Sequence, residues 1–163
     1  MLKAFSTVSV VLFLCGLPAA AQGIEATQTM ERIVKMEYED GSTEFEFVPV
    51  DEAEPGEELV YLMNYRNQGD EPEDDVVMTL PVPDHMVYVE DSVLTETDGA
   101  EVYFSVDGGK SFAPREVLEV AEGEEVRKAD AQDITHVRWT FARLVPPGEE
   151  GTLAFRAAMT AMN

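Results

Sequence analysis

The chain has 163 residues and carries 33 acidic against 11 basic side chains, a formal net charge of −22. Nucleic acids and anionic lipid surfaces are bound through basic side chains, so this balance argues against both as partners. The length suits one domain with a core of ordinary size.

Residues 1–21 have the organisation of a secretory signal peptide. Lys3 is followed by an apolar run over 8–14, a Gly/Pro break and small residues up to Ala21. The run is shorter than the roughly 20 residues that span a bilayer. We therefore expect cleavage after Ala21 and a periplasmic or extracellular location. A retained N-terminal anchor is the alternative.

Cys15 is the only cysteine, and it lies inside this predicted signal peptide. A lipoprotein acylated at Cys15 is a further alternative, but Leu14 stands where a small residue is required. Cleavage after Ala21 leaves a mature protein without a disulfide or a reactive thiol.

We expect residues 22–29 to form a linker and residues 30–160 to form one domain. The domain opens with period-two alternation, which is typical of strands with one face toward a core. Val34, Met36 and Tyr38 alternate with charged residues, and after an Asp-Gly turn signal Phe45 and Phe47 alternate with glutamates. Both strands are expected to bury their apolar face.

The most apolar segment, residues 59–65, is expected to form a central strand covered on both faces for part of its length. Further strands are expected at 76–80, 86–89, 102–106, 135–142 and 152–158. In the strand at 135–142, Val137, Trp139 and Phe141 share the face expected to lie in the core. Residues 115–131 are expected to form a long connection, with one helical turn or a further short strand.

About seven to nine short strands separated by Gly, Pro and Asp turns predict an all-β fold, an antiparallel β-sandwich of the immunoglobulin-like kind. The segment SVDGGKSF (105–112) matches an Asp-box pattern. Asp107 can accept backbone hydrogen bonds across this turn, and Gly108 and Gly109 supply positive φ. We interpret Ser105 and Asp107 as determinants of the fold.

An acidic run follows the central strand and offers oxygen ligands for calcium. Its candidate ligands are Asp70, Glu71, Asp74 and Asp75, with Glu73 between them. The spacing lacks the alternation of a calcium-binding loop, so a solvated loop is the favoured interpretation.

A copper site is the other metal hypothesis, because His85-Met86 combines imidazole and thioether ligands. Met159 and Met162 lie close together near the C-terminus. Met36, Met63 and Met78 fall on predicted core faces, where methionine is ordinary filling. Packing is therefore the favoured role of the methionines.

Catalytic motifs are absent from the sequence: it contains no G-x-S-x-G, no H-E-x-x-H and no cysteine in the mature chain. We expect no enzyme, no catalytic residues and no cofactor.

Four segments come in the order typical of a known family. They are PGEELVYLMNYRNQGDEPEDDVVMTLPVPDHMVYVEDS (55–92), VYFSVDGGKSF (102–112), DITHVRWTF (133–141) and VPPGEEGTLAFRA (145–157). Together they resemble the conserved-repeat domain-of-unknown-function family eleven. The resemblance implies an immunoglobulin-like sandwich in a bacterial or archaeal envelope or secreted protein, with a structural or adhesive role and no catalytic residues.

The first functional hypothesis is therefore an exported, non-catalytic structural or interaction module of the cell envelope. Its partner would be another envelope or secreted protein. The second is a periplasmic protein that binds a cation, calcium or copper.

Overall fold

The computed structural model describes residues 23–160 except 39, 41, 51, 53, 96 and 124, and it leaves out the side chains of 35, 43 and 45. The predicted signal peptide lies outside the described residues and stays a prediction. The described residues form eleven β-strands, two 3-10 turns and no α-helix. None of them belongs to a helix long and apolar enough to cross a membrane. The expected all-β class is confirmed.

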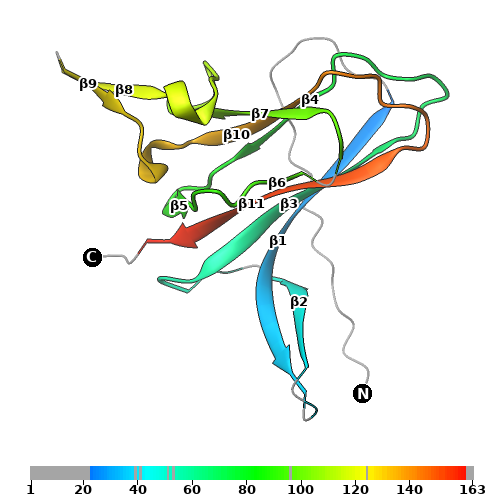
Figure 1. Ribbon diagram of the computed structural model, residues 1–163, viewed down its shortest axis with the longest axis horizontal. Coiled ribbons are helices and arrows are strands. Elements are labelled where there is room, and N and C mark those ends of the chain that lie inside the picture. Colours follow the sequence, from blue (N-terminus) through cyan, green and yellow to red (C-terminus); the bar gives the residue numbers. More distant parts are fainter. Residues whose placement is uncertain are drawn as a thin grey trace.

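Two antiparallel sheets make up the body of the molecule (Figure 1). The larger has the order β2 (Thr43–Pro49), β1 (Ile24–Glu37), β3 (Glu58–Asn67), β11 (Glu150–Met159) and β5 (Met86–Tyr88), and β6 (Leu94–Thr95) also pairs with β11. The smaller has the order β4 (Val77–Pro81), β10 (His136–Phe141) and β7 (Ala100–Ser105). A separate hairpin joins β8 (Glu119–Glu122) to β9 (Glu125–Lys128).

One apolar core lies between the two sheets. Val137, Trp139 and Phe141 are buried as expected, because alternate residues of β10 point toward the larger sheet. The Trp139 Nε1–H donates to Thr95 Oγ1 at 3.1 Å, so burial leaves no indole donor unpaired. On the facing sheet Phe155 is fully buried and belongs to the same core cluster.

The central position expected for residues 59–65 is confirmed, because β3 pairs with β1 on one side and β11 on the other. Leu59, Val60 and Tyr61 are buried in succession, which shows that both faces are covered there. Further along, Asn64 and Arg66 are exposed on the outer face. The strand is therefore covered on both faces over its first half only.

The last strand, β11, lies inside the larger sheet between β3 and β5. In an antibody constant domain the last strand belongs to the three-stranded sheet instead. The strand order therefore describes an all-β sandwich whose final strand is placed differently from that of antibody constant domains.

The prediction of a linker at residues 22–29 is wrong from Ile24 onward, because the residues from Ile24 already belong to β1. They pair with the outer edge of β3, from Ile24 opposite Asn67 to Thr29 opposite Leu62. The segment IEATQT has too few apolar residues to show a period. It is a strand because β3 offers an edge to pair with, which is a non-local cause.

The long connection over 115–131 contains both elements that the sequence left open. A 3-10 turn spans Arg115–Val117, and the β8–β9 hairpin follows it. A second 3-10 turn spans Ala131–Asp133, and at its start the Asp133 carboxylate accepts a hydrogen bond from Asp130 N at 2.7 Å.

Candidate interaction surface

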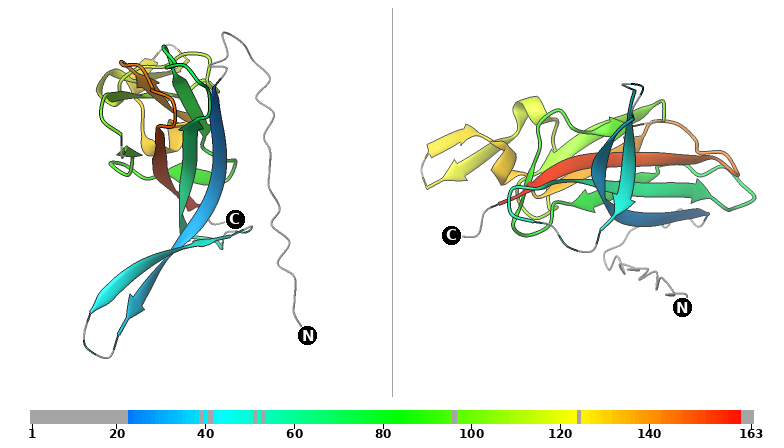
Figure 2. Two further views of the ribbon diagram at one scale, coloured as in Figure 1. Left: turned by 90° about the vertical axis from the view of Figure 1, so that its right-hand side faces the viewer. Right: turned by 90° about the horizontal axis from the view of Figure 1, so that it is seen from below.

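A long hairpin made by the end of β1 and by β2 projects from the body of the molecule (Figures 1 and 2). β1 pairs with β3 only as far as Arg32, opposite Leu59, whereas its pairing with β2 continues to Glu37. Beyond Arg32 no other described strand pairs with this two-stranded ribbon. We call residues 33–47 the arm.

Apolar side chains of the arm are exposed on both faces of this ribbon. The exposed fractions are 37% for Ile33, 39% for Met36, 47% for Tyr38 and 47% for Phe47. No described arm residue belongs to the core cluster or packs against it. The expectation that Met36, Tyr38 and Phe47 lie on core faces is therefore wrong. Period two predicts a strand, but it does not reveal whether a second sheet covers that strand.

Both edges of the arm are also open. Backbone hydrogen bonds from Tyr38 N to Ser42 O and from Val50 N to Met30 O, 3.0 Å each, fix which residue pairs are hydrogen-bonded. Antiparallel pairs alternate, so residues 44 and 46 direct their main-chain groups toward β1. The main-chain groups of 43, 45 and 47 consequently point away from β1, on the side where no described strand pairs with β2.

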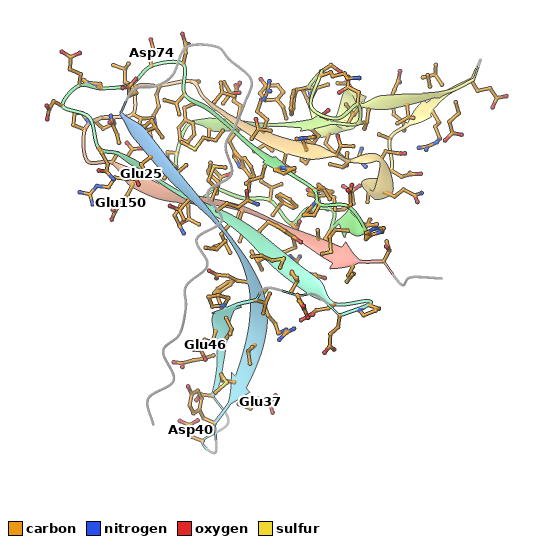
Figure 3. The ribbon with its side chains drawn as sticks, turned by 180° about the vertical axis from the view of Figure 1, so that it is seen from behind. Glu25, Glu37, Asp40, Glu46, Asp74 and Glu150 are labelled. Atoms are coloured by element: carbon orange, nitrogen blue, oxygen red, sulfur yellow. The ribbon has the colours of Figure 1, made fainter. Side chains whose placement is uncertain are left out.

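Carboxylates accompany the apolar side chains of the arm. Figure 3 places Glu37, Asp40 and Glu46 on it, far from Asp74 at the opposite end of the molecule. Glu44 accepts a hydrogen bond from Tyr38 Oη at 2.8 Å, which raises the pKa of that phenol. Asp40 accepts from Ser42 N and Oγ at 2.9 and 2.6 Å, and these bonds lower the pKa of its carboxyl group.

The base of the arm is fixed to the body by an ion pair. The Arg32 guanidinium donates through Nε and Nη2 to the two carboxylate oxygens of Glu57, the latter contact at 3.0 Å. The hydrogen bond from Arg32 lowers the pKa of the Glu57 carboxyl group. The bidentate geometry orients the ribbon where it leaves the sheet.

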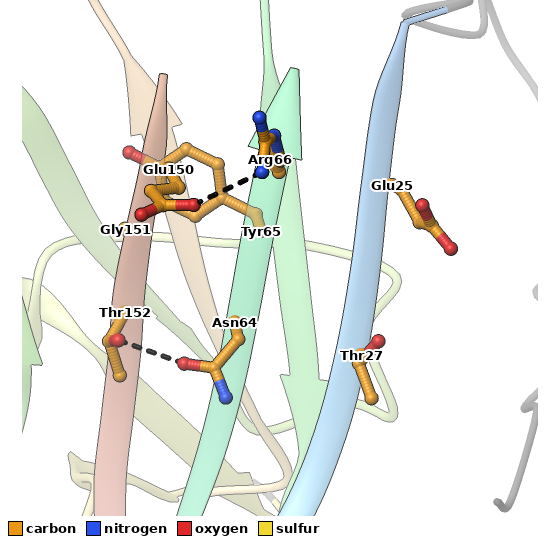
Figure 4. Close-up of a pocket in the computed structure, with 8 residues that line it drawn as sticks. All are labelled: Glu25, Thr27, Asn64, Tyr65, Arg66, Glu150, Gly151 and Thr152. Carbon is orange, nitrogen blue, oxygen red and sulfur yellow. Dashed lines mark hydrogen bonds and ion pairs between the residues drawn. The ribbon is translucent and has the colours of Figure 1, made fainter. Parts of the chain in front are cut away.

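A shallow, open hollow of about 660 Å³ lies on the outer face of the larger sheet (Figure 4). Two cross-strand rows cross it: one sets Glu25, Arg66 and Glu150 side by side, and the other sets Thr27, Asn64 and Thr152 side by side. Thr152 Oγ1 donates to Asn64 Oδ1 at 2.8 Å. Arg66 Nη1 lies 3.6 Å from Glu150 Oε2. The remaining lining residues are Tyr65 and Gly151. The hollow is therefore open and lined mainly by polar side chains, two pairs of which contact each other.

The carboxylates predicted for calcium lie in the loop after β3. Asp70, Glu71, Asp74 and Asp75 are all exposed. Within the described part of the chain, no group of three or more His, Cys, Asp or Glu side chains is placed to hold a metal ion. Glu73 turns inward instead, and its Oε1 accepts from Gly23 N at 2.9 Å. The calcium hypothesis stays a prediction.

The methionines and histidine considered for copper lie in three environments. Met63 and Met78 are buried, as predicted, whereas Met36 is exposed on the arm. Met86 and Met159 are register partners on β5 and β11. His85, just before Met86, has a positive φ of 66°, and its carbonyl accepts from Thr160 N at 2.8 Å. Met162 lies outside the described residues, and copper binding stays a prediction.

The turn after β7 has the structural role expected for Ser105 and Asp107. Asp107 Oδ1 accepts from the backbone N–H groups of Lys110 and Ser111 at 3.0 Å each, and Oδ2 accepts from Ser111 Oγ at 2.6 Å. These hydrogen bonds hold the pKa of the Asp107 carboxyl group far below its ordinary value. Gly108 and Gly109 have φ of 74° and 81°, as predicted.

The outer face of the smaller sheet carries a cation–aromatic contact that the sequence did not predict. The Arg138 guanidinium carbon lies 3.4 Å from the centroid of the Phe112 ring, and Nε donates to Thr79 Oγ1 at 3.1 Å. Burial lowers the pKa of Arg138. The other described arginines pair with carboxylates, but Arg138 has no such partner among the described side chains. Strand alternation places Arg138 outward, yet nothing in the sequence brings Phe112 to it.

Comparisons with known proteins add no relative. No protein-family model matches the chain, and no curated protein and no solved structure is significantly similar to it. The resemblance to the conserved-repeat family is not tested by these comparisons and stays a prediction.

Proposed function

We propose that the chain is an exported, non-catalytic interaction module of the cell envelope, and that the arm is its docking element. The single observation that carries this proposal is the exposure of Ile33, Met36, Tyr38 and Phe47 on a ribbon that no other described element packs against. Four large apolar side chains on one projecting hairpin differ from the singly scattered apolar residues of an ordinary surface.

The geometry of the arm suits docking in a further respect. An isolated two-stranded ribbon is only marginally stable in water, so its apolar side chains and main-chain groups gain most when a partner covers them. The Arg32–Glu57 pair joins the base of the arm to the body, and the arm projects beyond it (Figure 2). A partner can therefore approach both faces and both edges.

Site-specific photo-crosslinking in the native host tests the proposal. A photoreactive residue replaces Phe47, and in a control protein it replaces Val126, which is 64% exposed on the β8–β9 hairpin. We expect a discrete adduct with one other exported protein from position 47 only. Mass spectrometry identifies that protein, and the complex is then reconstituted from purified components.

Two results would contradict the proposal. One is the absence of any adduct from position 47, and the other is the same set of adducts from positions 47 and 126.

A further inference from the structure

We infer that the partner supplies an extended strand, basic on one face and apolar on the other, which adds to the open edge of β2. This inference rests on the proposed role of the arm as the docking element and names the chemistry of its partner. It follows from the hydrogen-bonding groups, the apolar side chains and the charges of the arm.

The open edge supplies the main-chain part of this recognition. Residues 43, 45 and 47 direct their N–H and C=O groups away from β1, toward the side on which the described part of the chain places no strand. An extended segment that pairs with these groups converts the two-stranded ribbon into a three-stranded sheet. Addition of a strand to an exposed edge is a common mode of peptide recognition.

The side chains of β2 determine which strand fits. Glu44 and Glu46 share one face of the ribbon with Val34 and Met36, because register partners and alternate residues point the same way. Phe47 lies on the opposite face beside its register partner Ile33. A complementary strand therefore carries Lys or Arg opposite the glutamates and apolar residues opposite Phe47.

A second copy of the chain fits this edge poorly. Antiparallel pairing of two β2 strands centred on residue 45 would set Glu44 of one copy opposite Glu46 of the other. Like charges directly opposite each other destabilise a strand pair. The whole chain also has a formal net charge of −22, which opposes self-association. Charge complementarity thus favours a basic segment of another protein.

Fluorescence anisotropy with designed peptides tests the inference on the mature chain at physiological ionic strength. The probe is a labelled peptide of alternating Lys and Val, and its matched control has the same composition with all Lys before all Val. We expect the alternating peptide to bind more tightly than the blocked one, because only alternation places the charges on a single strand face.

Charge reversal on the arm sharpens the test. Glu44→Lys with Glu46→Lys should weaken binding of the Lys/Val peptide by about tenfold and create binding of an alternating Glu/Val peptide. The control variant, Asp70→Lys with Glu71→Lys, makes the same change of net charge on an exposed loop of the body. It should change the affinity by less than about twofold, because salt screens charges that lie beyond a Debye length.

Three results would overturn the inference: equal binding of the alternating and blocked peptides, equal weakening by the two charge-reversed variants, or a dimer of the chain that disappears when the arm is shortened. If position 47 still crosslinks to an exported protein, the arm is a docking element for a different partner chemistry. If neither crosslinking nor peptide binding occurs, the proposed function fails as well.

Discussion

Asn67 is a buried carboxamide that joins the loop after β3 to the segment before β11. Its Nδ2 donates to the carbonyls of Glu71 and Val145 at 3.0 and 2.8 Å, and its Oδ1 accepts from Gly69 N at 2.9 Å. The side chain is fully buried, and it supplies the hydrogen bonds of the Glu71 carbonyl and the Gly69 N–H, whereas the Val145 carbonyl also accepts from Glu73 N at 2.9 Å. A neutral side chain therefore makes three of the hydrogen bonds that hold the acidic loop against the segment before β11.

Replacing this residue tests that role. Asn67→Ala leaves the Glu71 carbonyl and the Gly69 N–H without their partner, and we expect a loss of roughly 2–3 kcal/mol in the free energy of unfolding. Urea denaturation of the mature domain measures it. Asn64→Ala on the same strand is the control, because Asn64 is exposed, and its loss should stay below about 0.5 kcal/mol. Equal losses for the two variants would contradict the assignment.

Asp107 makes the free energy of unfolding of the domain depend on pH in the acid range. Its pKa is depressed in the folded protein, chiefly by hydrogen bonds from Ser111 and also from Ser105. The stabilisation is therefore present above the ordinary pKa of 3.8 and is lost as the pH falls further toward the folded value. Asp107→Asn keeps the shape of the side chain but cannot carry this charge.

We accordingly expect Asp107→Asn to be less stable than the natural protein at neutral pH, with a difference that shrinks once the pH falls below 3.8. Urea denaturation at several pH values measures the two free energies of unfolding. A difference independent of pH would show that the charge of Asp107 does not stabilise the turn.

At the scale of elements, the arm is separable from the sandwich. Arg32 and Val48 are register partners at its base, so an Asn-Gly turn can join them in place of residues 33–47. Because none of the arm's described side chains belongs to the core cluster, we expect this deletion to change the free energy of unfolding by less than about 1 kcal/mol. Thermal and urea unfolding of the shortened chain measure it, and a shortened chain that fails to fold would contradict separability.

Most strands could be predicted from local patterns, whereas the layer that covers each strand could not. Alternation in β10 predicted the buried face of Trp139, since that strand lies between two others against the larger sheet. The same alternation at Phe47 predicted a core face and was wrong. Thr27 and Thr29 showed no pattern, yet they lie in a strand because β3 pairs with them.

The candidate interaction surface was invisible in the sequence for the same reason. Period two at Met36 and Phe47 is identical to that of a buried strand. Only the end of the β1–β3 pairing at Arg32 turns these residues into an exposed ribbon. The contact between Arg138 and Phe112 likewise joins distant segments.

At the scale of the whole molecule, the formal net charge of −22 opposes the compact state through repulsion among carboxylates. Surface ion pairs such as Arg156–Glu58 and Arg115–Glu90 offset little of this repulsion, because exposed pairs contribute about 0–1 kcal/mol each. Raising NaCl from about 20 mM to about 0.5 M should therefore increase the Tm of the mature domain. Calorimetry measures it, and a Tm that falls with salt would show that the ion pairs outweigh the repulsion.

The central claim is that another protein docks on the arm along the open edge of β2. Residue-resolved hydrogen exchange by NMR, on the mature chain with and without the alternating Lys/Val peptide, tests it most directly. In the free chain, the amides of 43, 45 and 47 should exchange faster than those of 44 and 46, which are bonded to β1. With the peptide, protection should appear at 43, 45 and 47. Protection confined to the body of the sandwich, or no change in the arm, would contradict the claim.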